Sequence, residues 1–143
     1  MLDKTDVQEA NKATIRTYHH RLWGEGDLSA IPEYWDPAAK VHMTDFDGTG
    51  VEVVHEDAER YFNAFSGVTT TIHALLAEGD QVALHWSTLG THVAAYGEIA
   101  ATNRAITMAG IDILTLKDGK IVACASMWDG LSVFEQMGVL KIG

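Results

Sequence analysis

Residues 105–138 read AITMAGIDILTLKDGKIVACASMWDGLSVFEQMG and contain the strongest local signal in the chain. Two apolar, β-branched runs flank Asp118-Gly119, and an Asp-Gly pair between such runs is typical of a two-residue hairpin turn. This turn predicts a long antiparallel hairpin with a defined register. The facing pairs that we expect are Lys117–Lys120, Leu114–Ala123, Asp112–Ala125, Gly110–Met127 and Met108–Asp129.

Alternation along the two strands predicts that Asp112 and Asp129 point to the same face of the hairpin. Their neighbours on that face are apolar or small. An unpartnered carboxylate is costly there, so each acid should be hydrogen-bonded, have a raised pKa, or both. At roughly 3.3 Å per residue the two acids lie about 13 Å apart, too far to share a proton. We therefore expect them to flank a bound molecule.

The opposite face of the hairpin is also largely apolar and needs cover. In a chain of 143 residues, which fits a single domain spanning 1–143, we expect a second subunit to supply that cover. A formal net charge of -10 argues against a nucleic-acid partner. The single cysteine, Cys124, cannot form an intrachain disulfide and is interpreted as a core residue.

The chain carries no apolar stretch near the ~20 residues that cross a bilayer, and its first ten residues lack an apolar signal core. We therefore expect a cytoplasmic protein with no membrane association. Neither a glycine-rich phosphate loop nor a Cys/His ligand spacing is present, so no cofactor and no metal are expected.

Hydrophobic periodicity predicts the order of the elements. Helices are expected over 5–23, over a short segment from Asp27, over 56–65, and as a last turn or two over 131–137. Strands are expected over 40–46, 69–77, 81–93 and along the two arms of the long hairpin, with a second hairpin turn at 78–80. Residues 94–103 break the alternation and are expected to form a loop at a pocket mouth.

This order predicts an α+β fold in which three N-terminal helices pack on a curved, mostly antiparallel sheet. Such a sheet encloses a cone, and its open end is the natural place for a ligand. In the register of the second hairpin, Trp86 lies opposite His73. The residues that share one face of the strand over 81–93 are Val82, Leu84, Trp86, Thr88 and His92.

Five segments together resemble one protein family. They are NKATIRTYHHRLWGEGDL (11–28), EYWDPAAKVH (33–42), AEGDQVALHWSTLGTH (77–92), ITMAGIDILTLKDGKIV (106–122) and SMWDGLSVFEQMG (126–138). The chain resembles the SnoaL-like polyketide cyclases, within the cone-shaped NTF2-like (cystatin-like) domains related to nuclear transport factor 2. The resemblance implies a homodimer and a cofactor-free, intramolecular aldol-type closure of a hydrophobic carbonyl substrate, a polyketide ester.

The resemblance also implies catalytic roles. In such cyclases an Asp at the end of the last strand, at a fixed spacing before Leu-Gly or Met-Gly, acts as general acid and base. Here that position is Asp129, which would take a proton from the carbon between two carbonyls and return it to the new alkoxide. Asp129 also directly precedes residues 130–132, where an aspartate is a favoured helix N-cap. The family has a His seven residues before the hairpin glycine, where this chain has Asp112.

Asp112 is interpreted as a hydrogen-bond donor to an enolate oxygen, which requires that it be protonated at pH 7. The alternative is an acid satisfied by a neighbouring His or Tyr in the core. His92 and His42 are candidates for the polar end of the pocket, where they would orient a carbonyl or relay a proton. Trp86 and Met108 are expected to line the cavity. Weaker candidates for the lining are Met127 and Tyr96.

An isomerase and a hydrolase or hydroxylase relative are the alternatives that stay open on this fold. A ketosteroid-isomerase-like site would use a protonated Asp112 and Tyr18 on the first helix, but it would need His42 in place of a carboxylate base. A limonene-epoxide-hydrolase-like site would need an Arg where this chain has Gly110, so that constellation is absent. From another class, a non-catalytic module could hold a small apolar ligand in the cone, and fold alone does not choose among these.

Overall fold

The structure is a computed structural model and describes residues 3–141. Its elements are α1 (Lys4–His19), the π-helical turn η1 (His20–Gly24), α2 (Ala30–Tyr34), β1 (Trp35–Met43), β2 (Phe46–Thr49), α3 (Glu52–Ala64), β3 (Phe65–Glu78), β4 (Gln81–His92), β5 (Ala105–Lys117), β6 (Lys120–Trp128) and α4 (Gly130–Gln136). The predicted α+β class and the order of the main elements are confirmed. Two strands, rather than one, separate α2 from α3.

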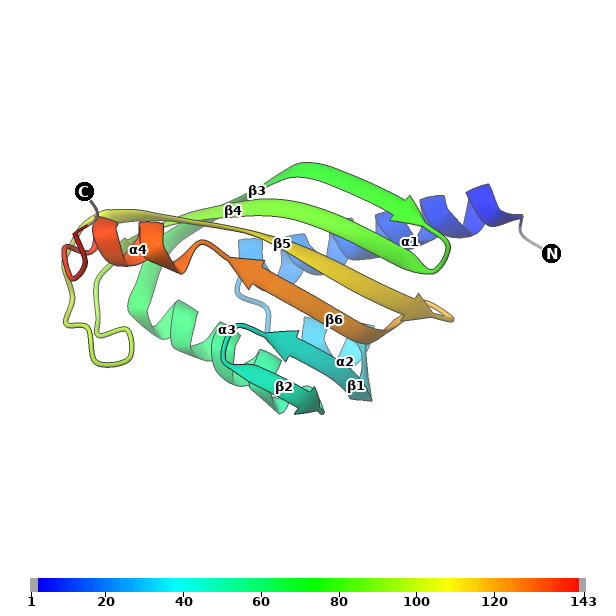
Figure 1. Cartoon of the computed structure of the whole chain (residues 1–143), viewed down its shortest axis with the longest axis horizontal. Coiled ribbons are helices and arrows are strands. Elements are labelled where there is room, and N and C mark those ends of the chain that lie inside the picture. Colours follow the sequence, from blue (N-terminus) through cyan, green and yellow to red (C-terminus); the bar gives the residue numbers. More distant parts are fainter. Residues whose placement is uncertain (1–2, 142–143) are drawn as a thin grey trace.

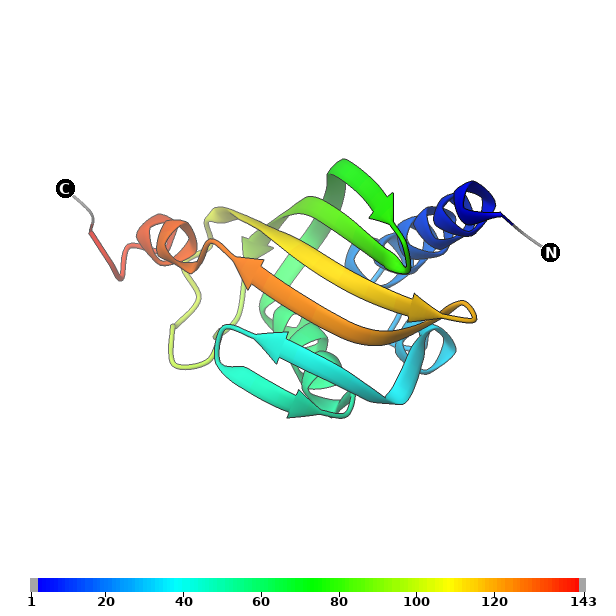
Figure 2. The same cartoon turned by 45° about the vertical axis from the view of Figure 1, so that its right-hand side comes forward.

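The six strands form one sheet in the order β2-β1-β6-β5-β4-β3. All neighbours are antiparallel except β1 and β6, which run parallel. The sheet curves over α1, α2 and α3, which lie against one face, whereas α4 lies at the end of β6 (Figures 1 and 2). The helices and the concave face of the sheet therefore enclose the cone that the element order predicted.

Helix α1 begins at Lys4, one residue before the predicted start of the helix. Asp3 is the N-cap, and its carboxylate accepts a hydrogen bond from the backbone N–H of Asp6 at 2.9 Å. Asn11, Ile15 and Tyr18 are buried at helical spacing. The helix then passes into η1, one turn of π-helix, a feature that is frequent at functional sites.

The β5–β6 hairpin turns at Asp118-Gly119 as predicted, and Lys117 pairs with Lys120. Its register is nevertheless wrong by one residue beyond the turn. Thr115 pairs with Ala123 and the next pair is Leu116 with Ile121, so Val122 is an extra residue that forms a β-bulge.

The bulge exchanges the two faces of β6, because side chains alternate with a period of two. Asp112 pairs with Ser126 instead of Ala125, and Gly110 pairs with Trp128 instead of Met127. The face predicted for the β6 residues is therefore wrong, and so is the prediction that Asp129 shares a face with Asp112.

A second irregularity near His73 shifts the β3–β4 ladder, so that Trp86 pairs with Ile72 rather than with His73. The prediction that these residues of β4 share one face is confirmed, since Val82, Leu84, Thr88 and His92 are all buried. Alternation within one strand is thus reliable even where the pairing between strands is not.

Buried side chains form two clusters between the helices and the sheet. One contains Ile15, Leu22 and Leu84, and the other contains Tyr61, Phe65 and Ile106. Trp23 and Trp86 pack against both clusters. The boundary between the two clusters is where the cavity described next is found.

Candidate active site

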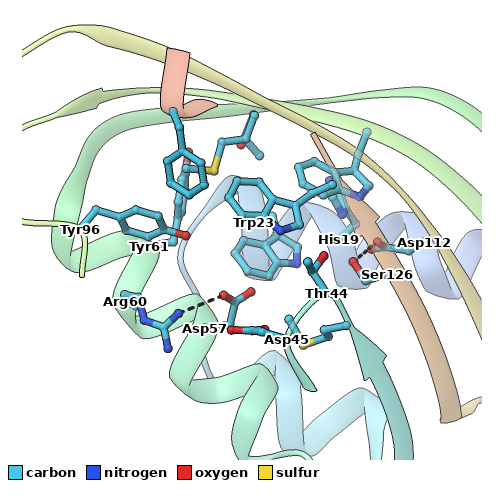
Figure 3. Close-up of a pocket in the computed structure, with 16 residues that line it drawn as sticks. His19, Trp23, Thr44, Asp45, Asp57, Arg60, Tyr61, Tyr96, Asp112 and Ser126 are labelled. Atoms are coloured by element: carbon cyan, nitrogen blue, oxygen red, sulfur yellow. Dashed lines mark hydrogen bonds and ion pairs between the residues drawn. The ribbon is translucent and has the colours of Figure 1, made fainter. Parts of the chain in front are cut away.

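A cavity of about 320 Å³ lies beside Trp23 and Trp86, between the two core clusters. Aromatic rings supply much of its wall: Trp23, Tyr61, Trp86, Tyr96, Trp128 and Phe134. Its polar lining comes from His19, Thr44, Asp45, Asp57, Arg60, Thr88, Asp112 and Ser126. A largely apolar cavity with a few polar groups is typical of a small-molecule site (Figure 3).

Asp112 lies in the wall formed by β5 and β6. Ser126, its partner across the ladder, donates a hydrogen bond from Oγ to Asp112 Oδ1 at 2.6 Å. Burial raises the pKa of Asp112, while the hydrogen bond from Ser126 and the nearby indole N–H of Trp86 act in the opposite direction. Within the described residues, Oδ2 of Asp112 has no hydrogen-bond partner, so this oxygen is free to meet a ligand.

His19 enters the same cavity from the last turn of α1 and is 2% exposed. The hydroxyl of Thr70 donates to the backbone oxygen of Ser87 at 3.2 Å, so it accepts from His19 Nε2 at 2.8 Å. Burial lowers the pKa of His19 to about 4. The imidazole is therefore neutral at pH 7, and its Nδ1 carries the lone pair.

Asp57 and Asp45 occupy another part of the cavity wall. Asp57 comes from α3, Asp45 follows β1, and Arg60 Nη1 lies 3.9 Å from Asp57 Oδ1 (Figure 3). Burial raises the pKa of Asp57 to about 6, and the charges of Asp45 and Asp112 act in the same direction, against that of Arg60. The cavity thus holds carboxyl groups from three separate elements.

Besides Asp112, three of the residues expected in the cavity are found there. Trp86, Met108 and Tyr96 all line it. The indole N–H of Trp86 is shielded and makes no hydrogen bond within the described chain, although it lies near enough to Asp112 to favour the charged carboxylate.

Asp129 and Met127 lie outside the cavity, because the Val122 bulge turns this end of β6 around. Met127 is 60% exposed on the outer face of the sheet. Asp129 is exposed and caps α4, with its Oδ1 accepting from the backbone N–H of Ser132 at 3.0 Å. The capping interpretation of Asp129 is confirmed.

His92 is fully buried but does not line the cavity. Its Nδ1 accepts from the backbone N–H of Thr102 at 3.2 Å, and its ring stacks on Phe65 with centroids 5.1 Å apart. These contacts tie the end of β4 to the loop that follows it. The expected location of His92 at the polar end of the pocket is therefore wrong.

His42 and Tyr18 also lie elsewhere. His42 is exposed beside Asp47, with 3.6 Å between Nδ1 and Oδ1, and it borders a shallow depression away from the main cavity. Tyr18 is 4% exposed, packs edge-on against Trp35, and its pKa is raised by burial. Both expected locations are wrong, since His42 projects from β1 away from the cavity and Tyr18 is enclosed by core residues.

Sequence reasoning missed several residues of the site. His19 follows the buried Ile15 by four residues and so shares its face of α1, a signal from which its burial could have been predicted. Asp57 precedes the buried Tyr61 by four residues on α3 and had the same signal. Ser126 could be found only by locating the bulge.

Within residues 3–141, no three His, Cys, Asp or Glu side chains are grouped closely enough to hold a metal ion. In the same part of the chain, no helix is long and apolar enough to span a bilayer. The cavity lining itself offers carboxyl groups, a neutral imidazole and hydroxyls among aromatic rings.

The chain matches the family model of the SnoaL-like polyketide cyclases over residues 13–137 and belongs to that family. A search of curated proteins finds no match. Among solved structures, a "putative SnoaL-like polyketide cyclase" from Jannaschia sp. CCS1 is similar with a TM-score of 0.84 and 17% identity, covering 99% of this chain and 100% of that one.

Two streptomycete proteins have the same fold. AclR, "a putative hydroxylase" from Streptomyces galilaeus, is similar with a TM-score of 0.84 and 22% identity over 94% of this chain and 99% of its own. IdmH, "a putative polyketide cyclase" from Streptomyces antibioticus, has a TM-score of 0.75 and 24% identity over 90% of this chain and 99% of its own. The NTF2-like cone expected from the sequence is thereby confirmed.

Proposed function

We propose that this protein catalyses cofactor-free proton transfer on a hydrophobic carbonyl compound, in an intramolecular aldol-type ring closure, with Asp112 as the general base. The observation that carries the proposal is the environment of Asp112. Its carboxyl lies in the wall of an aromatic cavity, where Ser126 holds one oxygen and the other has no hydrogen-bond partner among the described residues.

The first step follows from this geometry. Oδ2 of Asp112 removes a proton from the carbon between two carbonyl groups, and a raised pKa makes the carboxylate a stronger base for that task. The enolate carbon then attacks a second carbonyl within the same molecule. A carbon–carbon bond forms, and the attacked oxygen becomes an alkoxide that needs a proton.

The surrounding side chains suit such a substrate. Trp23, Trp86 and Trp128 offer flat apolar surfaces that exclude water and bind a hydrophobic ring or chain. Neutral His19 offers a hydrogen-bond acceptor at neutral pH, suited to an enol or hydroxyl group. The family to which the chain belongs and the similarity to IdmH, a "putative polyketide cyclase", also support a cyclase. AclR, "a putative hydroxylase", represents another activity on this fold.

One observation favours a second candidate, a ketosteroid-isomerase-like function. That function needs a carboxylate base on or near the first strand, where His42 is unsuitable because it faces away from the cavity. Asp45, two residues after the end of β1, lines the cavity together with Asp112. In an isomerase, Asp45 would take the proton and a protonated Asp112 would donate a hydrogen bond to the enolate oxygen.

The experiment uses Asp112→Asn and Asp45→Asn with ethyl 3,7-dioxo-7-phenylheptanoate, a β-keto ester whose C2 can close a six-membered ring on the distant aryl ketone. NMR in D2O follows exchange at C2 and ring closure, each above the uncatalysed rate. A cyclase that uses Asp112 as base loses both with Asp112→Asn by about 100-fold or more. A mild effect of Asp112→Asn combined with a large effect of Asp45→Asn would reverse the two roles.

Binding of the probe by the native protein without exchange or closure would contradict the enzymatic proposal and favour a non-catalytic binding module. Tryptophan fluorescence measures that binding directly, because Trp23, Trp86 and Trp128 line the cavity.

We also propose that the protein is a homodimer through the outer face of the sheet. Ile111 and Met127 pair across the β5–β6 ladder on that face, with Ile113 two residues away. They are 52%, 60% and 45% exposed, respectively. Adjacent exposed apolar side chains of this size are typical of a protein interface.

A further inference from the structure

In the proposed cyclisation, Asp112 takes a proton from the attacking carbon. The attacked carbonyl oxygen, on the other side of the new carbon–carbon bond, then needs a proton. If the proposed function holds, a group in the cavity must supply this proton. Asp57 projects from α3 into the cavity, on another part of its wall from Asp112 on β5 (Figure 3). A substrate held between α3 and the sheet would therefore have one carboxyl group on each side.

The groups that face Asp57 favour a protonated carboxyl. Asp45 from the segment after β1 and Asp112 from β5 both add negative charge, and Tyr96 from the loop after β4 lies close enough for its pKa to be raised by the charge of Asp57. The only cation among these neighbours is Arg60, on the same helix, at 3.9 Å. A single cation at that distance does not neutralise the combined effect of burial and two neighbouring carboxylates.

Asp57 differs from the other acids of α3. Glu56 is exposed, and Glu59 pairs with His55 on the solvent side of the helix, at 3.5 Å. Asp57 instead shares its helix face with Tyr61, one turn later, which is 4% exposed and also lines the cavity. The Tyr61 hydroxyl itself is directed toward Gly90 of β4, and the nearby Thr88 side chain partly opposes the rise of its pKa on burial.

We propose that Asp57 is the second catalytic carboxyl of the site and that, in its protonated form, it donates its proton to the alkoxide oxygen as the ring closes. The C2–H bond breaks and its proton passes to Asp112. The new carbon–carbon bond forms, the electrons of the attacked C=O move to oxygen, and that oxygen takes the proton of Asp57. The product is an isomer of the substrate. Asp112 then returns a proton through solvent to Asp57, which restores both groups.

This assignment predicts a bell-shaped pH profile. Asp112 must be ionised, so activity rises as the pH passes the pKa of Asp112, whereas Asp57 must be protonated, so activity falls as the pH passes about 6. The falling limb belongs to Asp57 alone. The falling limb of the profile should be absent in Asp57→Asn. In Asp57→Glu it should be present at a different pH.

The test compares Asp57→Asn with Glu56→Gln, which removes the same charge from the outer surface of the same helix. Both are assayed with ethyl 3,7-dioxo-7-phenylheptanoate for C2 exchange and for ring closure. We expect Asp57→Asn to slow closure by about 100-fold or more while C2 exchange, the step of Asp112, continues. Glu56→Gln should change neither rate, and circular dichroism checks that both variants fold.

Closure at the native rate in Asp57→Asn, with the falling limb intact, would overturn the role of Asp57 and leave the proposed function standing if Asp112→Asn still abolishes exchange. Equal loss of exchange and closure in Asp57→Asn would also overturn it, because that pattern indicates a general disturbance of the cavity. If Asp112→Asn leaves C2 exchange intact, the proposed function itself fails.

Discussion

Ser126 Oγ lies 2.6 Å from Asp112 Oδ1, directly across the β5–β6 ladder, and this contact exists because Val122 forms a bulge in β6. Without the extra residue, Asp112 would face Ala125 and its carboxyl would have no hydroxyl partner. The bulge therefore places the hydrogen-bond donor of the site and, in the same step, turns Asp129 out of it.

Replacement of Ser126 by alanine removes a hydrogen bond that lowers the pKa of Asp112. The pKa of Asp112 should then rise further, because burial is left less opposed. Since the base must be ionised, the rising limb of the pH profile should move to higher pH, while the falling limb stays in place. The rate of C2 exchange against pH measures this shift, and an unchanged rising limb would show that Ser126 does not influence the base.

Asp129 should behave as a helix cap. Asp129→Asn keeps an acceptor for the Ser132 N–H and should leave both stability and ring closure near the native values. Asp129→Ala should lower the free energy of unfolding by about 1 kcal/mol. Chemical denaturation and the closure assay measure these effects, and loss of activity in folded Asp129→Asn would return Asp129 to the catalytic role that the family resemblance implied.

The sequence contained enough information to predict the element order, because alternation and helical periodicity depend on which side chains must be buried. It also predicted the hairpin turn, since Asp118 and Gly119 both have positive φ values, 51° and 77°, which suit these residue types. Only pairing across the ladder could show the bulge at Val122. No glycine marks that position, and one apolar residue in a run of apolar residues carries no local signal.

The candidate site was harder to predict than the fold for a related reason. Trp86 and Met108 were found because they alternate with core residues on single strands. His19 and Asp57 lie on helices at the border between buried and exposed positions, where a polar residue is usually solvated. Their enclosure depends on how α1 and α3 pack against the curved sheet, which is a tertiary property.

His19 should make the protein sensitive to acid. Its pKa in the folded state, about 4, lies below the value of 6.5 for an unperturbed histidine, so the fold favours the neutral form. The resulting stability is present above about pH 6.5 and is lost as the pH falls toward 4. The fall in pKa corresponds to at most about 3 kcal/mol.

His19→Gln should therefore flatten the decline of the unfolding free energy between pH 6.5 and 4, even if it lowers stability at pH 7. His20→Gln is the control, because the His20 side chain is 67% exposed. Urea denaturation at several pH values measures both variants. An equal slope in His19→Gln and in the native protein would contradict a buried, neutral His19.

Gly110 should not tolerate a side chain. A Cβ atom there would lie 2.5 Å from the backbone oxygen of Met127 and 2.6 Å from Trp86 Cζ2. Gly110→Ala should cost at least about 2 kcal/mol and displace the Trp86 indole from the cavity wall, which tryptophan fluorescence would detect. Gly48→Ala is the control, since its Cβ would mainly meet the ring tip of the half-buried Phe46. Equal stability of the two variants would contradict the close packing at Gly110.

The outer face of the sheet should be a subunit interface, and a charge at its centre should separate the subunits. Ile113 is 45% exposed on that face. In the β5–β6 ladder it lies between Ile111, which pairs with Met127, and Thr115, which pairs with Ala123. Ile113→Lys would bring two like charges together in an apolar contact, so we expect monomers. Val7→Lys, on the exposed side of α1, is the control and should leave the association unchanged. Sedimentation velocity distinguishes the two states. A native protein that sediments as a monomer, or an Ile113→Lys variant that remains a dimer, would rule out this face as the interface.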